Sequence, residues 1–346
     1  MAYISFQPKD YFKSKIYTGN NSSSNAITGV GFQPDWTWIK GRNYGDSHRM
    51  YDSVRGAANY ITPNATVAQS NAYPLTSFDS DGFTIGSSDV SVNGSYNYVS
   101  WNWKAGTTSG IDTTGADITP SSYTMSSTAG ISIVKFTGNG VDGAKIAHGL
   151  GAVPELIISK RLDSSNYWAV FHKVDVTDYL VLNTSDAFSD APLWKDTMPT
   201  SVYYQTDSST SVNASGDEMV AYSFKSVKGF SQIGNYTGSG NSNGPFLYTG
   251  FKPAFLIAKR TDGGSESWIM LDNGRDTFNI TDDVVFANLS QQEESNQSSK
   301  GVDFCSNGIK LKSTDGVING SGLSYIYMAF AEHPLVSSNN IPATAR

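Results

Sequence analysis

The sequence of 346 residues is poor in cysteine and in charged residues, and each shortage excludes a class of protein. A single cysteine, Cys305, cannot form an intrachain disulfide or a cysteine-based zinc site. Charged residues make up only 16% of the chain, the net charge is -7, and Lys and Arg form no run. A nucleic-acid partner, which requires clustered cations, is therefore not expected.

Long apolar runs are also absent. No segment reaches the roughly 18 apolar residues of a membrane span, and the first ten residues lack the basic and then apolar run of a secretory signal. We therefore expect a protein that is made and folded in a cytoplasm and does not insert into a membrane.

Aromatic residues, Gly, Ser, Thr and Asn replace the missing charge. The chain has 33 Gly, and 12% of its residues are aromatic. Tyr, Phe, Trp and Thr favour half-buried pleated strands, and Gly and Asn favour the turns between them. The composition therefore predicts an all-β protein, and the length predicts two or three domains.

Three segments of the chain repeat one order of motifs. Each opens with a Thr-Gly phrase, continues through a Gly and a Pro into a strand that ends in Lys, and closes on an aromatic strand. The closing strands are Tyr96–Lys104, Glu218–Lys225 and Tyr325–Glu332. Matching order and spacing in three copies predict three tandem copies of one unit.

Within the repeats, residue types alternate with the period of two that strands show. Val220, Tyr222 and Phe224 share one face of their strand, and Asp-Gly and Asn-Gly pairs mark hairpin turns. We expect three β-sandwich units with a jelly-roll-like arrangement. The predicted divisions are an N-terminal arm (1–15), repeat 1 (16–104), a linker poor in large apolar residues (105–130), repeat 2 (131–226), repeat 3 (229–335) and a C-terminal tail (336–346).

Residues that could carry chemistry are few. None of the four histidines has a partner at metal-binding spacing, and His172 stands where the other repeats have Asp52 and Asp272, which indicates a polar residue facing a turn. Asp79 and Asp81 lack the later bidentate Glu of a calcium loop and read as a turn between strands.

The usual catalytic motifs are likewise missing. The sequence shows no embedded carboxylate pair, no Gly-x-Ser-x-Gly elbow and no phosphate-binding loop. We expect no catalytic residues, no metal, no cofactor and no enzymatic activity.

The tryptophans raise a binding hypothesis, because pyranose faces pack on indole rings. Trp103, Trp168 and Trp268 fall where the other repeats also carry large or apolar residues, which favours core packing. Trp194 lies outside the repeated strands and is the candidate for an exposed, ligand-binding ring.

Several phrases of the chain resemble tail-fibre and related virion structural proteins of marine tailed bacteriophages. The phrases are Ser100–Gly106, Gly130–Gly140, His148–Gly151 and Gly250–Pro334. The resemblance implies a component of the virion surface, a tail fibre or fibre-like appendage involved in host adsorption. It further implies contacts with other virion proteins, a homotrimer and a host cell-surface glycan as partner.

Two other functions stay open. The chain could be a capsid-attached fibre or decoration protein with a purely architectural role, in which the arm Met1–Ser14 attaches it to the particle. It could also be a depolymerase that cleaves host polysaccharide.

Overall fold

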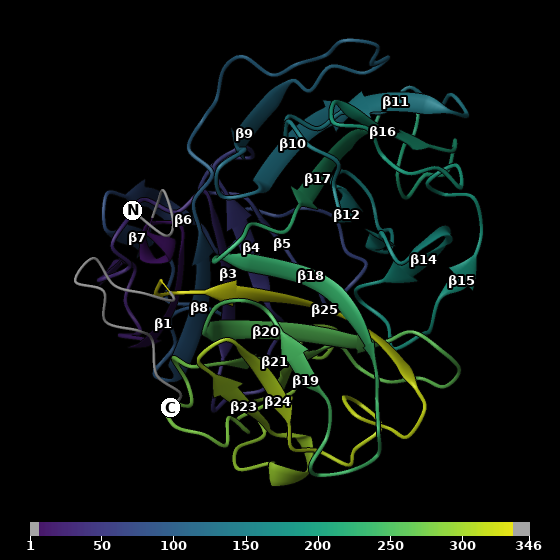
Figure 1. Cartoon of the computed structure of the whole chain (residues 1–346). Coiled ribbons are helices and arrows are strands. Elements are labelled where there is room, and N and C mark those ends of the chain that lie inside the picture. Colours follow the sequence, from purple (N-terminus) through teal and green to yellow (C-terminus); the bar gives the residue numbers. More distant parts are fainter. Residues whose placement is uncertain (1–6, 335–346) are drawn as a thin grey trace, which may run out of the picture.

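The computed structural model describes residues 7–334, and the prediction of an all-β protein is confirmed (Figure 1). Apart from the short 3-10 helices η1 (Pro8–Asp10) and η2 (Ser298–Lys300), every regular element of the described residues is a β-strand. The strands form three pairs of one large and one small sheet, one pair for each predicted repeat, and the two sheets of a pair pack face to face as a sandwich.

The large sheets share one strand order. In repeat 1 it runs β1 (Phe12–Thr18), β8 (Asn97–Trp103), β3 (Trp36–Gly41), β4 (Arg49–Asp52), β5 (Tyr60–Ile61). In repeat 3 it runs β18 (Ser231–Thr237), β25 (Ser324–Ala331), β20 (Pro253–Arg260), β21 (Ile269–Asp272), β22 (Val285–Phe286). In repeat 2 it runs β9 (Ser122–Ser126), β10 (Ile131–Thr137), β17 (Glu218–Phe224), β12 (Leu156–Arg161), β13 (Ala169–His172), β14 (Asp175–Val181), β15 (Ser189–Asp190).

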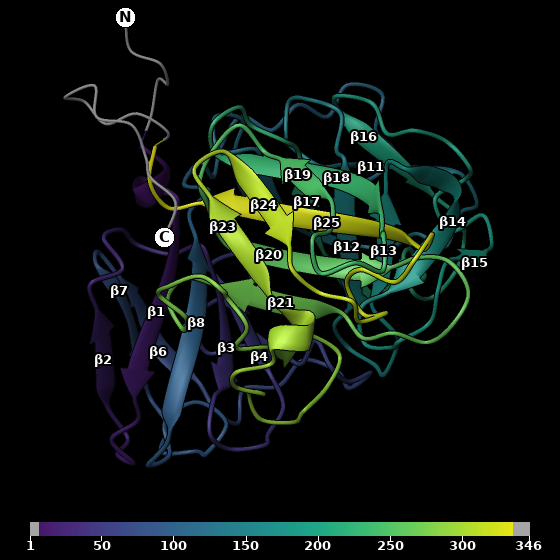
Figure 2. The same ribbon diagram turned by 60° about the horizontal axis from the view of Figure 1, so that its bottom comes forward.

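The small sheets cover the outer faces of the large ones. In repeat 1 the small sheet contains β2 (Asn25–Thr28), β7 (Gly82–Ile85) and β6 (Leu75–Asp79); in repeat 2, β11 (Ala144–Ala147) and β16 (Tyr203–Thr206); in repeat 3, β19 (Phe246–Tyr248), β24 (Gly308–Leu311) and β23 (Val302–Cys305). Figure 2 shows the layers in repeat 3, where β19, β24 and β23 lie in front of β25 and β20. Each sandwich encloses an outer core of its own.

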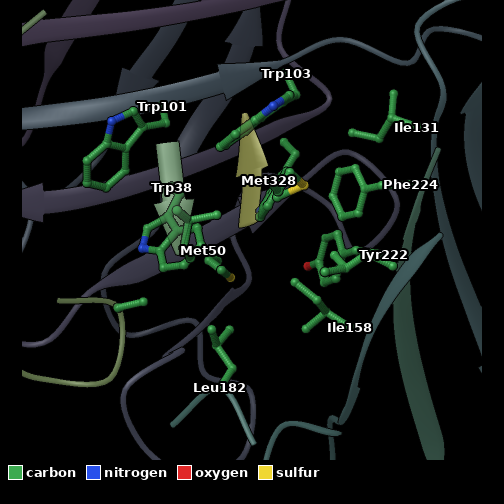
Figure 3. Close-up of a cluster of buried hydrophobic side chains, with 14 of the residues drawn as sticks. Trp38, Met50, Trp101, Trp103, Ile131, Ile158, Leu182, Tyr222, Phe224 and Met328 are labelled. Carbon is green, nitrogen blue, oxygen red and sulfur yellow. The ribbon is translucent and has the colours of Figure 1, made fainter. Parts of the chain in front are cut away.

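The inner faces of the three large sheets meet in one further core that all three repeats share. Figure 3 shows Trp101, Trp103, Tyr222, Phe224 and Met328 converging in it. Both faces of the central strands are therefore buried, as in β3, where all six residues are buried. Three like cores are present as the repeat predicts, but the shared fourth core joins them into one body.

The Thr-Gly phrase that opens each repeat has a steric reason. A Cβ atom added at Gly19, Gly138 or Gly238 would lie 1.9, 2.2 or 2.3 Å from a backbone oxygen of the loop before the closing strand. Only a residue without a side chain allows so close an approach of two backbones. The phrase is therefore a structural signature of the fold.

Two predicted boundaries differ from the structure. The segment 105–130, predicted as a linker, contains β9, which pairs with β10 along the edge of the large sheet, and Ile118, which is buried in the outer core of repeat 2. The segment 1–15, predicted as an arm, includes the start of β1, and Phe12 is fully buried in the central core. Short polar segments become strands here because a sheet edge is available to pair with them. The C-terminal tail (336–346) lies outside the described residues.

Candidate functional site

The interfaces between repeats hold buried polar groups at matching positions. Lys40, Lys160 and Lys259 are the next-to-last residues of β3, β12 and β20, and all three are fully buried. Each Nζ donates a hydrogen bond to a backbone carbonyl of a neighbouring repeat. The acceptors are Ser290, Thr66 and Ser185, at 3.1, 3.2 and 3.1 Å. Burial lowers the pKa of each lysine to about 8, because the charged form loses its hydration.

Ring nitrogens form a second set of bonds between repeats. Nε1 of Trp168 donates to the carbonyl of Thr62 at 3.1 Å, and Nε1 of Trp268 donates to the carbonyl of Val181 at 3.0 Å. These bonds join repeat 2 to repeat 1 and repeat 3 to repeat 2.

His48 takes the place of the tryptophan in repeat 1. Its Nδ1 accepts a hydrogen bond from Nε1 of Trp38 at 2.9 Å, so Nε2 carries the proton and donates to the carbonyl of Phe286 in repeat 3, 3.0 Å away. Burial, together with the charge of Lys40, lowers the pKa of His48 well below its ordinary value. His48 is thus a neutral structural donor.

Backbone hydrogen bonds complete a ring of three repeats. Each joins the loop after β5, β14 or β22 in one repeat to the residue directly after β12, β20 or β3 in the next repeat. The pairs are Gln69 N to Leu162 O, Phe188 N to Thr261 O and Glu293 N to Arg42 O. Repeat 1 donates to repeat 2, repeat 2 to repeat 3, and repeat 3 to repeat 1. One chain therefore forms the closed cyclic arrangement that three separate subunits form in a trimer.

A buried ion pair lies where repeats 1 and 2 meet. Nε of Arg55 lies 2.6 Å from Oδ2 of Asp52, and the hydroxyl of Tyr222 donates to the same oxygen at 2.6 Å. Arg55 also donates to Gln69. Burial, and then the charge of Asp52, raises the pKa of Tyr222 well above its ordinary value, so the hydroxyl remains a donor.

Repeat 3 carries the same arrangement against repeat 1. Nε of Arg275 lies 2.5 Å from Oδ2 of Asp272, which also accepts from Nε1 of Trp101 at 3.0 Å. Glu293 binds Arg275 at 3.1 Å and Arg42 at 2.8 Å. Although burial opposes ionisation of Glu293, the two arginines hold its pKa below the ordinary value. Nothing in the sequence analysis identified these ion pairs; an Arg three residues after the Asp in two repeats was the available signal.

Repeat 2 lacks this ion pair. His172 stands where the other repeats have Asp52 and Asp272, and Asp175 stands where they have Arg55 and Arg275. Phe188 stands where they have Gln69 and Glu293, which contact those arginines. His172 faces the turn after β13, where its Nδ1 accepts a hydrogen bond from the backbone N–H of Val174. The ring is nevertheless fully buried, and its Nε2 has no hydrogen-bond partner among the described residues. Burial, and then the charge of Lys173, lowers the pKa of His172 to about 3.

The candidate Trp194 is not exposed. It is only 2% accessible and packs edge-on against Phe171 and Tyr204 in the outer core of repeat 2. All seven tryptophans are buried, so none offers a face to a sugar. The core interpretation of Trp103, Trp168 and Trp268 agrees with their burial.

Two further polar candidates, His148 and Asp81, bond to backbone. His148 accepts at Nδ1 from Leu150 N and contacts Thr200 O through Nε2, and burial lowers its pKa to about 4. Asp81, in the turn between β6 and β7, accepts from the backbone N–H groups of Gly29 and Gly31 at 2.9 and 2.6 Å.

One acidic group appears that the sequence analysis did not single out. Carboxylate oxygens of Asp276, Asp282 and Asp283 lie within 4.8 Å of one another. Burial and mutual repulsion raise the pKa of Asp282 and Asp283. Three oxygens fall short of the six to eight that calcium takes, and Arg42 lies 3.6 Å from Asp283, so the group is partly neutralised by protein.

Two open grooves follow the repeat interfaces. One of about 550 Å³ lies between repeat 1 and the segment before β9, and its lining includes Asp35, Lys104 and Tyr123. The other, of about 450 Å³, lies between β14 and β18 and includes Asp175 and Asp262. Their linings are mixed and polar, and neither includes a histidine. In the first groove the hydroxyl of Ser53 donates a hydrogen bond to Oδ1 of Asp35 at 2.8 Å.

Fold and interfaces together define an all-β protein of three sandwich repeats closed into a ring around a shared core. The chain belongs to the family described as domain of unknown function DUF7483, whose model matches residues 7–334. No curated protein and no solved structure matches the chain. In residues 7–334, no helix has the length and apolar character needed to span a membrane.

Proposed function

We propose that this chain is a non-enzymatic structural protein of a bacteriophage particle, a tail fibre or fibre-like appendage that contacts the host surface. The sequence phrases shared with tail-fibre and related virion proteins motivate the proposal. The observation that carries it is the closed ring of buried inter-repeat hydrogen bonds around one core.

An adsorption appendage must stay folded outside the cell and must present its loops on a firm support. This chain has no disulfide to hold it, but each repeat is bound to both neighbours through the lysine, ring-nitrogen and backbone bonds. Opening one repeat would break these bonds and expose the shared aromatic core to water, which is costly. The repeats are therefore expected to unfold together.

A second candidate function, an architectural decoration protein of the capsid, is favoured by the free sheet edges. β9 covers the edge of β10, but in the described residues no strand covers the matching edges of β1 and β18. Such edges accept an added strand from another protein. The homotrimer inferred from the resemblance stays a prediction.

Immunogold labelling of purified particles, with antibodies raised against the recombinant chain, tests the proposal. Label on the tail or its appendages is the expected result. Label on the head alone would favour the decoration protein, and unlabelled particles would refute both. Incubation of the chain with host polysaccharide should release no shorter saccharides; if it does, the chain is a depolymerase.

A further inference from the structure

Two aromatic rings lie exposed on the outer face of the small sheet of repeat 3. Phe246 and Tyr248 are 45% and 68% accessible, whereas Leu247 between them is buried in the outer core. The strand β19 thus follows the ordinary alternation, but its solvent side carries aromatics where polar residues are usual. Figure 2 shows β19 and β24 side by side in the layer in front of the large sheet.

The fold does not require these rings. The matching positions are the exposed Ala26 and Thr28 in β2 of repeat 1, and Lys145 and the buried Ala147 in β11 of repeat 2. The outer face of the small sheet in repeat 2 does have an aromatic ring, Tyr203 in β16, but the ammonium of Lys145 lies 5.5 Å above its centroid. Among the small sheets of the described residues, only that of repeat 3 leaves aromatic faces open.

A glycine sets the orientation of the first ring. Gly308 in β24 pairs with Tyr248, and a Cβ added to it would meet Cζ and Cε1 of Phe246 at 2.5 and 2.9 Å. The Cζ and Cε1 edge of the Phe246 ring therefore lies close to the backbone of Gly308, and the ring stays 45% accessible. Tyr248 continues the aromatic surface along β19, and its ring lies near Gly250.

Charged side chains border the rings on the same face. Lys310 pairs across the sheet with Phe246 on one side and Asp303 on the other, and Asp303 lies 3.9 Å from Lys312. An open ring face beside hydrogen-bond donors and an acceptor matches a pyranose, whose C–H face is apolar and whose hydroxyls point outward.

We propose that Phe246 and Tyr248 form a binding platform for a pyranose of a host-surface glycan, with Lys310, Lys312 and Asp303 contacting its hydroxyl groups. This inference rests on the proposed adsorption function and assigns it a site. A protein partner fits less well, because a stable interface buries about 800 Å² per partner around an apolar centre. Here the sheet's outer face continues from two rings directly into Lys310 and Asp303.

Binding of the fluorescently labelled full chain to intact host cells and to an array of bacterial surface glycans tests the platform. Tyr248→Ala and the double variant Phe246→Ala/Tyr248→Ala should weaken binding about tenfold or more, since each ring contributes a stacking contact. Phe278→Ala is the matched control, because Phe278 is an exposed aromatic of repeat 3 outside the platform, 74% accessible. It should bind within about twofold of the unmodified chain.

The double variant Phe246→Trp/Tyr248→Trp should bind as the unmodified chain does, unlike the double alanine variant. Binding should also persist at about 0.5 M salt, because salt does not screen stacking contacts. Tyr248→Ala removes a ring with little packing, so its effect is separable from folding. If the unmodified chain binds but Tyr248→Ala and the double variant bind equally well, the platform is wrong and the adsorption function stands. If the unmodified chain binds neither cells nor glycans, the adsorption function fails and the platform fails with it.

Discussion

The hydroxyl of Tyr222 in repeat 2 donates a 2.6 Å hydrogen bond to Oδ2 of Asp52 in repeat 1, deep inside the molecule. The same oxygen binds Arg55. The contact joins two repeats through a charge that is fully buried, so its loss should lower the free energy of unfolding of the whole chain.

Tyr222→Phe should lower the free energy of unfolding by roughly 1.5–3 kcal/mol, the usual contribution of a hydrogen bond to a charged group. Phenylalanine keeps the ring in the central core and removes only the donor. Chemical denaturation should show a lower midpoint with an unchanged slope. Tyr248→Phe is the control, since that ring is 68% accessible, and it should change stability by less than about 0.5 kcal/mol. Equal effects of the two variants would contradict the structural role of the contact.

Removing one partner of the buried ion pair should be more damaging. Arg55→Met leaves the carboxylate of Asp52 without its cation in a site closed to water, and we expect a loss of about 3–5 kcal/mol. The matched control is Lys195→Met, which breaks an exposed pair with Asp142 and should leave the free energy of unfolding nearly unchanged. Thermal unfolding of both variants under the same conditions gives the comparison.

The three buried lysines predict an unusual alkaline response. Their pKa is about 8 in the folded chain and near 10.4 when unfolded. Between these values the unfolded chain binds more protons, so stability should rise with pH, by roughly 2 kcal/mol per lysine from about pH 8 to about pH 10.

Above about pH 10 the trend should reverse. Burial raises the pKa of Tyr51 and Tyr222, so these tyrosines ionise first in the unfolded chain and favour unfolding. Denaturation midpoints measured across this range should show the maximum. Lys160→Met should flatten the rise between pH 8 and 10, and an unmodified chain that loses stability steadily from pH 8 would show that the lysines are not held as described.

Alternation, turn residues and the threefold order of motifs were enough to predict an all-β chain with repeated units. These are local properties: a period of two places Val220 and Tyr222 on one strand face whatever lies against that face. The Thr-Gly phrase was visible for the same reason, although the close backbone approach that requires Gly19 was not.

The candidate site was predicted less well, because burial depends on neighbours from other repeats. Trp194 lies outside the repeated strands, yet Phe171 and Tyr204 enclose it. His172 matches Asp52 and Asp272 in sequence position, and both aspartates bond to a residue of another repeat, which no single repeat reveals. The open rings of Phe246 and Tyr248 looked like any other aromatic strand residues, since the sequence does not show which face is left uncovered.

By itself the sequence determined the strands, the turns and the threefold repetition, because these follow from residue chemistry at short range. Only the tertiary structure decided that the inner sheet faces share one core and that buried lysines, ring nitrogens and ion pairs join the repeats in a closed ring. The lysine, ring-nitrogen and tyrosine hydrogen bonds between repeats connect positions 74 to 250 residues apart. The local sequence around one residue of such a pair therefore does not identify its partner.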